Sequence, residues 1–409
     1  MAEKLTNEQQ AAVDSRERSL LVSAAAGSGK TKVLVERLFS YVEREGANLD
    51  DFLIITYTRA AASELRGKIA KALTERMERD PGNYHLRQQM LRVYRADIKT
   101  VDAFCTALLR ENCHLLGEDA RGHALRPDFR VLDENEAQVL RERVLARTLD
   151  DFYDCLTPGG TLLADTLGAG RDDSALEDLV LELHAKLQAQ PYEDKWLEAQ
   201  RAFWRAVPDK IEDTPYGKIL LNEVRRKARH CKNLLQRAAQ EMCANDALNQ
   251  KYAPAFLDAS YQLEALEGKT AEGWDAARGV TIAFPRLAAV KDSDGGEMKA
   301  RMKSLWDNCK ETVKGFAEIF SASSDEAVED LRTMASAMLA LIDLTADFSR
   351  RYNEEKRRRN SADFSDQEHE AIRLLIGEDG APTELARIVS ARYREIMVDE
   401  YQDTNEAQN

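Results

Sequence analysis

The chain has 409 residues, 44% of them hydrophobic, which is enough for roughly two or three domains with real cores and excludes a small disulfide-stabilised scaffold. Its 58 Lys and Arg against 72 Asp and Glu give a net charge of −14, which disfavours nucleic-acid binding over the whole surface but still allows a locally basic groove. The six cysteines form no C-x-x-C pair or zinc spacing, the first residues lack an apolar h-region, and no stretch is long enough to cross a bilayer, so we expect a cytoplasmic protein with no membrane partner.

The first elements of the chain surround a glycine-rich loop at residues 24–31 (AAAGSGKT). Before it, residues 19–22 (SLLV) predict a short buried strand. After it, apolar residues recur at helical spacing, at Leu34, Leu38 and Val42. A strand, a glycine-rich turn and a helix in this order are typical of a loop that holds the phosphates of a nucleotide.

The residues of this loop match that chemistry, although Ala24 stands where the usual G-x-x-x-x-G-K-[ST] pattern has glycine. Lys30 can reach the β and γ phosphates, and the Thr31 hydroxyl can ligate Mg²⁺. The turn can direct its backbone N–H groups at the phosphates, and those groups belong to Ala26, Gly27, Ser28 and Gly29. The alternative is a Gly/Ser-rich linker without a ligand.

Three further strands are predicted, at residues 52–56 (FLIIT), 98–101 and 396–398. Each is short and is followed by polar residues, helical patterns separate them, and no hairpin signal occurs. We therefore predict an α/β fold with a parallel, doubly wound sheet flanked by helices, whose ligand lies at the carboxyl ends of the strands.

The middle of the chain is different. Residues 117–359 are rich in Leu, Ala, Glu, Arg and Lys, which predicts a large all-helical subdomain inserted into the sheet domain. At its end, residues 356–359 (KRRR) can contact a phosphate backbone, but such a run is more often a solvated helix face. Ser365 and Glu368 have the spacing of a capping box and predict a helix start.

The second half of a nucleotide site comes last, in IMVDEYQDTN at residues 396–405. Apolar residues that end in Asp399 and Glu400 are typical of a Walker B strand. Asp399 would hold Mg²⁺, and Glu400 would orient and deprotonate the attacking water. The alternative for two adjacent carboxylates is a helix cap or a solvated turn.

The string DEYQDTN resembles the DExQDT box of the UvrD/Rep-like superfamily 1 DNA helicases, and other segments match that family in the same order. The resemblance implies ATP as the nucleotide and adds Gln402 to the catalytic residues. Residues 5–13 (LTNEQQAAV) resemble the family's Q motif, in which Gln9 would read the adenine edge. Thr6 and Gln9 also form a capping box, and both roles are compatible.

Two segments resemble the motifs with which this family contacts single-stranded DNA. Residues 56–66 (TYTRAAASELR) are similar to motif Ia, and residues 100–105 (TVDAFC) to motif Ib, with Asp102 where His is frequent. An aromatic side chain can stack on bases and hydroxyl or guanidinium groups can bind phosphates, so the candidates are Tyr57, Thr58, Arg59, Thr100 and Phe104. For Tyr57 and Phe104 the alternative is packing at the sheet edge.

Within the family, the loop, the form of motif Ib, the long insertion and residues 357–374 resemble the A subunit of AddAB-type helicase-nucleases, which are related to RecB. The resemblance implies a first RecA-like (P-loop NTPase) core at residues 1–116 and 360–409, with the insertion at 117–359. It also implies a second core with arginine fingers, a nuclease domain and a B-type partner subunit. We therefore expect an N-terminal fragment that by itself is inactive as a motor.

The expected function of the whole protein is ATP-dependent translocation on single-stranded DNA and unwinding of duplex DNA, in double-strand break repair and recombination. One alternative is a UvrD/Rep-type repair helicase without a nuclease. Another is a binding module for DNA or a partner protein that the nucleotide switches.

Overall fold

The computed structural model describes residues 5–17, 19–25, 27–118, 121–167, 174–377 and 379–408, and only the backbone of residues 292–295. Contacts divide the chain into two compact units. The sheet unit comprises Met1–Cys155, Asp172–Leu197 and Leu344–Asn409, and the helical unit comprises Leu156–Arg171 and Glu198–Asp343. This division does not follow the expected boundaries at 117 and 359, because a large part of residues 117–155 and 344–359 packs with the sheet unit.

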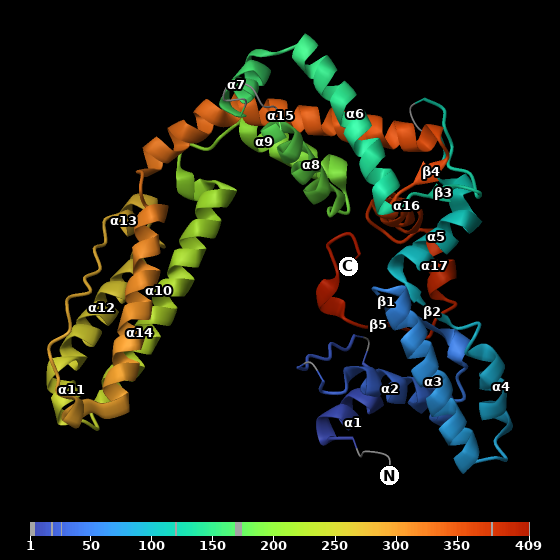
Figure 1. The fold of residues 1–409 in the computed structure, drawn as a ribbon, viewed down its shortest axis with the longest axis horizontal. Helices are drawn as coiled ribbons and strands as arrows, with labels where there is room; N and C mark the ends of the chain where they lie inside the picture. The colour runs from blue at the N-terminus through green and yellow to red at the C-terminus, as the bar shows by residue number, and fades with distance from the viewer. Residues whose placement is uncertain are drawn as a thin grey trace. The chain divides into compact units, whose positions relative to one another are not determined.

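A three-stranded parallel sheet lies in the sheet unit, in the order β2–β1–β5 (Figure 1). Its strands are β1 (Phe52–Thr56), β2 (Asp97–Thr100) and β5 (Glu395–Val398). In the register, Ile54 of the fully buried central strand lies opposite Ile98 on one side and Met397 on the other. The three strands predicted at 52–56, 98–101 and 396–398 and their parallel arrangement are confirmed, with shifts of one residue at some ends.

The strand predicted at residues 19–22 is wrong. Residues 19–25 have no strand partner among the residues that the structure describes, and Leu20, Leu21 and Val22 are 42%, 76% and 41% exposed. A run of apolar residues has the composition of a buried strand, but a strand exists only where a neighbouring strand completes its hydrogen bonds. The glycine-rich loop therefore follows an irregular segment.

Helices α2 and α3 pack on the sheet through one apolar cluster that includes Leu38, Leu65 and Met397. Gly46 ends α2 with a left-handed backbone, and Thr58 caps the start of α3 with its hydroxyl. The helices that lie wholly in the sheet unit are α1 (Asn7–Asp14), α2 (Lys30–Glu45), α3 (Arg59–Arg79), α4 (Tyr84–Arg92), α5 (Val101–Asn112), α6 (Glu134–Asp154), α8 (Ser174–Gln188), α16 (Phe364–Leu375) and α17 (Glu384–Ser390).

A second apolar cluster joins α5 and α16 beside a small parallel pair, β3 (Arg130–Val131) and β4 (Ser361–Ala362). The helix predicted near residue 365 is α16, but its capping box is formed by Asp363 and Asp366, two residues before the expected pair. Asp363 is the residue with extended backbone, so it and not Ser365 can accept from the third backbone N–H of the helix.

The helical unit has its own core, in which Phe256 and Trp306 stack with ring centroids 4.8 Å apart. Its helices are α7 (Pro158–Leu167), α10 (Pro215–Met242), α11 (Asp246–Lys251), α12 (Ala253–Lys269), α13 (Trp274–Arg278) and α14 (Asp292–Ile319), while α9 (Glu193–Arg205) and α15 (Ser324–Arg358) each contribute residues to both units. Short 3₁₀ turns occur at Leu49–Asp51, Cys113–Leu115, Ile211–Asp213 and Tyr401–Asp403. In the part of the chain that the structure describes, no helix combines the length and apolar character that a membrane span requires.

Candidate nucleotide and DNA site

The structure brings together a lysine from the start of the chain and a glutamate from its end. Lys30 is the first residue of α2, and Glu400 follows β5. The Nζ atom of Lys30 lies 3.8 Å from the Oε2 atom of Glu400, with 29% and 48% of the two side chains exposed. The glycine-rich loop and the acidic strand end therefore face the same place at the carboxyl edge of the sheet.

Two glycines shape the loop. Gly27 and Gly29 have φ angles of +77° and +86°, a region in which residues with a Cβ are strained. The Ser28 N–H donates to the Ala25 carbonyl over 3.2 Å, which closes a tight turn, and Lys30 donates to the Ala24 carbonyl over 3.4 Å. Loop residues 24, 25, 27 and 28 are exposed, and Thr31 is half-buried in the first turn of α2. Ala26 lies outside the described residues.

Gln9 forms the predicted capping box with Thr6 and also contacts the loop. Its backbone N–H donates to the Thr6 hydroxyl over 3.2 Å, and its side-chain oxygen accepts from the Thr6 N–H over 3.0 Å. The Nε2 group of Gln9 donates to the Ser28 carbonyl over 2.9 Å. One amide side chain thus connects the start of α1 with the loop, beside the place where a nucleotide would lie.

The acidic end of β5 has an unusual backbone. The Asp399 N–H donates to the Ile55 carbonyl over 3.0 Å and continues the pairing of β5 with β1. Glu400 then turns into the left-handed region with φ +57°, which is uncommon for a residue with a side chain and occurs preferentially at functional sites. Gln402 donates to the Glu400 carboxylate over 2.6 Å, so the predicted catalytic glutamine positions the predicted base.

Tyr57, Thr58 and Arg59 lie where β1 ends and α3 begins. The Tyr57 hydroxyl lies 2.6 Å from that of Thr404, so the segments after β1 and β5 contact one another. Thr58 is exposed but uses its hydroxyl to cap α3, with the Ala61 N–H 3.0 Å away. Arg59 is exposed on the first turn of α3.

Thr100 and Phe104 are placed differently. Thr100 is only 6% exposed, and its hydroxyl caps α5 by accepting from the Ala103 N–H over 3.2 Å. Phe104 is half-buried and packs against the cluster of α5 and α16. Between them, burial raises the pKa of Asp102, which the charge of Arg59 partly opposes. The two side chains therefore have structural roles, and their contact with DNA stays a prediction.

The residues present fit a nucleotide with Mg²⁺. Thr31 and Asp399 offer the hydroxyl and carboxylate oxygens that Mg²⁺ prefers. The exposed turn between Gly27 and Gly29 lies at the N-terminus of α2, where backbone N–H groups and the helix dipole favour an anion. Lys30 and Glu400 are close enough to act on one ligand.

The same chain matches a known family over nearly its whole length. Residues 5–409 match the UvrD/REP helicase N-terminal domain. The chain belongs to this helicase family. The matched range contains both the loop and the acidic strand end that the structure brings together.

Two similar proteins have the name of the A subunit of an ATP-dependent helicase/nuclease. The chain is 32% identical over 419 residues to the protein of this name from Ruminiclostridium cellulolyticum, covering 98% of this chain and 33% of that protein. It is 36% identical over 432 residues to the protein of the same name from Desulfitobacterium hafniense, covering 99% of this chain and 30% of that protein. The chain therefore spans about a third of the length of these relatives.

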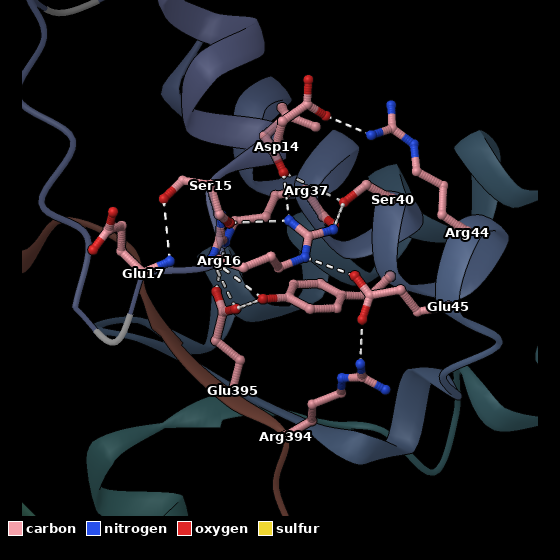
Figure 2. A network of polar contacts seen from close by, with 12 residues as sticks. Asp14, Ser15, Arg16, Glu17, Arg37, Ser40, Arg44, Glu45, Arg394 and Glu395 are labelled. Carbon is pink, nitrogen blue, oxygen red and sulfur yellow. Dashed lines mark hydrogen bonds and ion pairs between the residues drawn. The ribbon is translucent and has the colours of Figure 1, made fainter.

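This UvrD-like chain also contains an ion network that its sequence did not reveal (Figure 2). Arg37 of α2 is 6% exposed and donates to both oxygens of Glu395, over 2.6 and 2.9 Å. Tyr41 donates to the same carboxylate, and burial together with Glu395 raises the pKa of Tyr41. The helix that begins at Lys30 is thereby bound to the first residue of the strand that leads to Glu400.

The network extends to the end of α1. Arg37 also donates to the carbonyls of Ala12 and Ser15, over 2.8 and 2.6 Å. Arg16 donates to Ser40 over 2.8 Å, and its guanidinium lies 3.8 Å from the centre of the Tyr41 ring. A charged residue on the apolar face of α2, one position before Leu38, is the signal in the sequence that could have indicated such a buried partner.

Proposed function

We propose that this chain is the ATP-binding part of the A subunit of an ATP-dependent DNA helicase and nuclease. The observation that carries the proposal is the 3.8 Å approach of Lys30 to Glu400, because ATP hydrolysis needs a phosphate-binding cation and a base at one place. The names of the relatives support a helicase-nuclease over a UvrD/Rep-type helicase without a nuclease.

In this proposal each residue of the site has a defined role. Lys30 binds the β and γ phosphates with the backbone of the loop, and Gln9 reads the adenine edge. Thr31 and Asp399 hold Mg²⁺, which when bound neutralises charge on the phosphates. Glu400 accepts a proton from the attacking water, and Gln402, which donates to its carboxylate, keeps it in position.

The DNA contact is proposed at the ends of β1 and β2. Tyr57 supplies a stacking surface, Thr58 and Arg59 bind phosphates, and the segments of Thr100 and Phe104 complete the site. The hydrogen bond between Tyr57 and Thr404 supports a link from this surface to the acidic strand end. We expect hydrolysis to be coupled through this link to movement on single-stranded DNA and to unwinding of duplex DNA.

The whole protein is proposed to act in double-strand break repair and recombination, in the cytoplasm and with a B-type partner subunit. Residues 1–116 and 360–409 would be the first RecA-like core, and residues 117–359 an accessory insertion. A second core would supply the arginine finger, which is worth about 10³ to 10⁵ in rate. We therefore expect the 409-residue chain by itself to hydrolyse ATP only slowly.

The test is the rate of ATP hydrolysis with and without single-stranded DNA, on the 409-residue chain and on the full-length protein. We expect stimulation by DNA in the full-length protein. Glu400→Gln should lower kcat by about 10² or more while ATP still binds, because a general base contributes on that scale. The exposed Glu406 gives a matched control, since Glu406→Gln changes the same charge a few residues further on.

Two results would contradict the proposal. A full-length protein whose turnover survives both Lys30→Ala and Glu400→Gln does not use this site. A protein that keeps its biological activity with these substitutions is a nucleotide-switched binding module, not a motor.

Degradation of duplex DNA in the presence of ATP separates a helicase-nuclease from a helicase without a nuclease.

A further inference from the structure

A pocket of about 410 Å³ lies in the sheet unit between α6, α15 and the segment before α6. Its lining contains five arginines, Arg121, Arg147, Arg350, Arg351 and Arg358. It contains three carboxylates, those of Asp151, Glu354 and Glu355. The lining is therefore positively charged, in a chain whose net charge is −14.

Helical spacing concentrates these charges. On α6, Arg147 and Asp151 are four residues apart, and on α15, Arg350, Glu354 and Arg358 follow one another at the same interval, so each set lies on one face of its helix. Salt bridges from Arg351 to Asp151 and from Arg143 to Glu355 connect α6 and α15 at this point. The two helices that form most of the pocket are thus connected to each other by salt bridges.

Four of the five lining arginines pair with carboxylates, but some of these carboxylates are shared, and Glu354 pairs with both Arg121 and Arg350. Glu355 alone accepts from Arg358 over 2.8 Å, from Arg359 over 2.6 Å and from Arg143 over 3.3 Å. Arg147 makes no salt bridge within the residues that the structure describes, although its charge, in addition to the hydrogen bond from Arg358, acts on Glu355 and helps to lower the pKa of that carboxyl. An additional anion would therefore meet guanidinium groups that are not fully neutralised, and guanidinium forks suit phosphate oxygens.

The exposure of the arginines indicates the kind of ligand. Arg121 and Arg358 keep 61% and 60% of their side-chain surface in solvent, so a charged polymer that lies on the surface can reach them. The basic run at residues 356–359 contributes only in part, because Lys356 is buried against Asp363 and Asp366 and Arg357 pairs with Glu370. Arg358 is the member of that run that lines the pocket.

We propose that this pocket binds phosphate groups of a DNA backbone, as a contact additional to the one proposed at Tyr57, Thr58 and Arg59. The ligand class rests on the proposed function. Single-stranded and duplex DNA share these phosphates, and the pocket binds them through charge and fork geometry without reading bases. Because the pocket lies on α6 and α15, it would give the protein a DNA contact away from the ends of the β-strands.

The experiment measures binding of the full-length protein to a labelled single-stranded oligonucleotide and to a blunt duplex, at salt concentrations from about 50 to 200 mM. The variants are Arg147→Gln, which breaks no salt bridge with the described residues, and Arg147→Gln combined with Arg358→Gln. Each lost phosphate contact should reduce the slope of log Kobs against log salt by about 0.9 for duplex or 0.7 for single strands. Arg79→Gln is the matched control, since Arg79 is an exposed helical arginine without a hydrogen bond or salt bridge to the described residues.

A reduced slope for one DNA form identifies that form as the ligand, and Arg79→Gln should leave both slopes unchanged. If both variants keep the wild-type slopes, in a protein that binds DNA and hydrolyses ATP in response to it, the pocket does not bind DNA phosphates. The proposed function would then remain intact. A wild-type protein that binds neither DNA form would overturn both. Thermal unfolding of each variant shows whether it is folded, and Arg147→Gln alone suffices if the double variant is not.

Discussion

Replacing Arg37 by alanine tests the ion network that binds α2 to β5. The substitution removes two hydrogen bonds to Glu395, at 2.6 and 2.9 Å, and two to the carbonyls of Ala12 and Ser15. Of the hydrogen-bond donors in this network, the Glu395 carboxylate then keeps the Tyr41 hydroxyl alone. We expect a large loss of stability because a mostly buried charge is left without its counter-charge.

The magnitude follows from burial. Removing one partner of a buried pair costs about 3 to 5 kcal/mol, and a hydrogen bond in which one group is charged contributes about 1.5 to 3 kcal/mol. The Glu395 side chain is 21% exposed, so water can partly solvate the carboxylate that remains. We therefore expect a loss of about 3 kcal/mol in the sheet unit, at the lower end of that range.

Hydrogen exchange of the β1 and β5 amides under native conditions measures this loss in the sheet unit alone. A double-mutant cycle with Glu395→Ala isolates the pair, and we expect a coupling of about 2 kcal/mol. Arg44→Ala is the control, because Arg44 lies on the same helix in a solvent-exposed pair with Asp14 and should matter far less. A loss below about 1 kcal/mol for Arg37→Ala, or additive single effects in the cycle, would refute the reasoning.

Three more outcomes follow from individual contacts. Burial lowers the pKa of His184 from 6.5 to about 3, so below pH 6.5 the unfolded chain binds a proton at this residue and the folded chain does not. The free energy of unfolding should therefore fall by about 1.4 kcal/mol for each pH unit below 6.5. In urea unfolding at pH 6.5 and pH 5, His184→Phe should remove this part of the pH dependence, and the same pH dependence in the variant and the wild type would contradict the prediction. Thr100→Ala should lower the free energy of unfolding by about 1 to 2 kcal/mol in thermal unfolding, because α5 loses the hydroxyl that caps it. Thr100→Ser keeps this hydroxyl and should not lower it, so equal losses in the two variants would show that the cap does not stabilise the helix. Gly29→Ala should weaken ATP binding roughly five-fold in a titration, because φ is +86° and the new Cβ would lie 3.3 Å from Gln9. Unchanged affinity for ATP would contradict this prediction.

The parts of the fold that follow from local pattern were predictable. Strand β1 has five apolar or β-branched residues and is buried throughout, and α2 has its apolar residues at helical spacing. The approach of Lys30 to the acidic pair was also expected, but only half of the reason holds. The acidic pair follows the carboxyl end of β5, whereas the segment before the Lys30 loop is not the parallel strand that was expected there.

What could not be predicted depends on partners that are distant in the chain. Residues 19–22 have the composition of a strand, but no described strand pairs with them. The hydroxyl of Thr100 has the chemistry of a phosphate ligand, yet it caps a helix and Thr100 is buried, which depends on the packing of distant segments. Arg37 and Glu395 are 358 positions apart, so no local pattern connects them.

Both ends of β5 form ion pairs with α2, so we expect the buried pair at one end to affect the site about two helical turns away. Glu395 at the start of the strand pairs with Arg37, and Glu400 after its end pairs with Lys30. Lys30 and Arg37 are seven residues apart, or about 10 Å along the helix, so α2 and β5 run in opposite directions with a contact at each end. The pair at Arg37 is mostly buried and strong, whereas the pair at Lys30 is exposed and can open for a ligand. A nucleotide whose phosphates pair with the Lys30 ammonium would therefore release Glu400, while the pair of Arg37 and Glu395 keeps β5 in register. Loss of the pair of Arg37 and Glu395 should therefore impair ATP hydrolysis even when the phosphate-binding loop is intact.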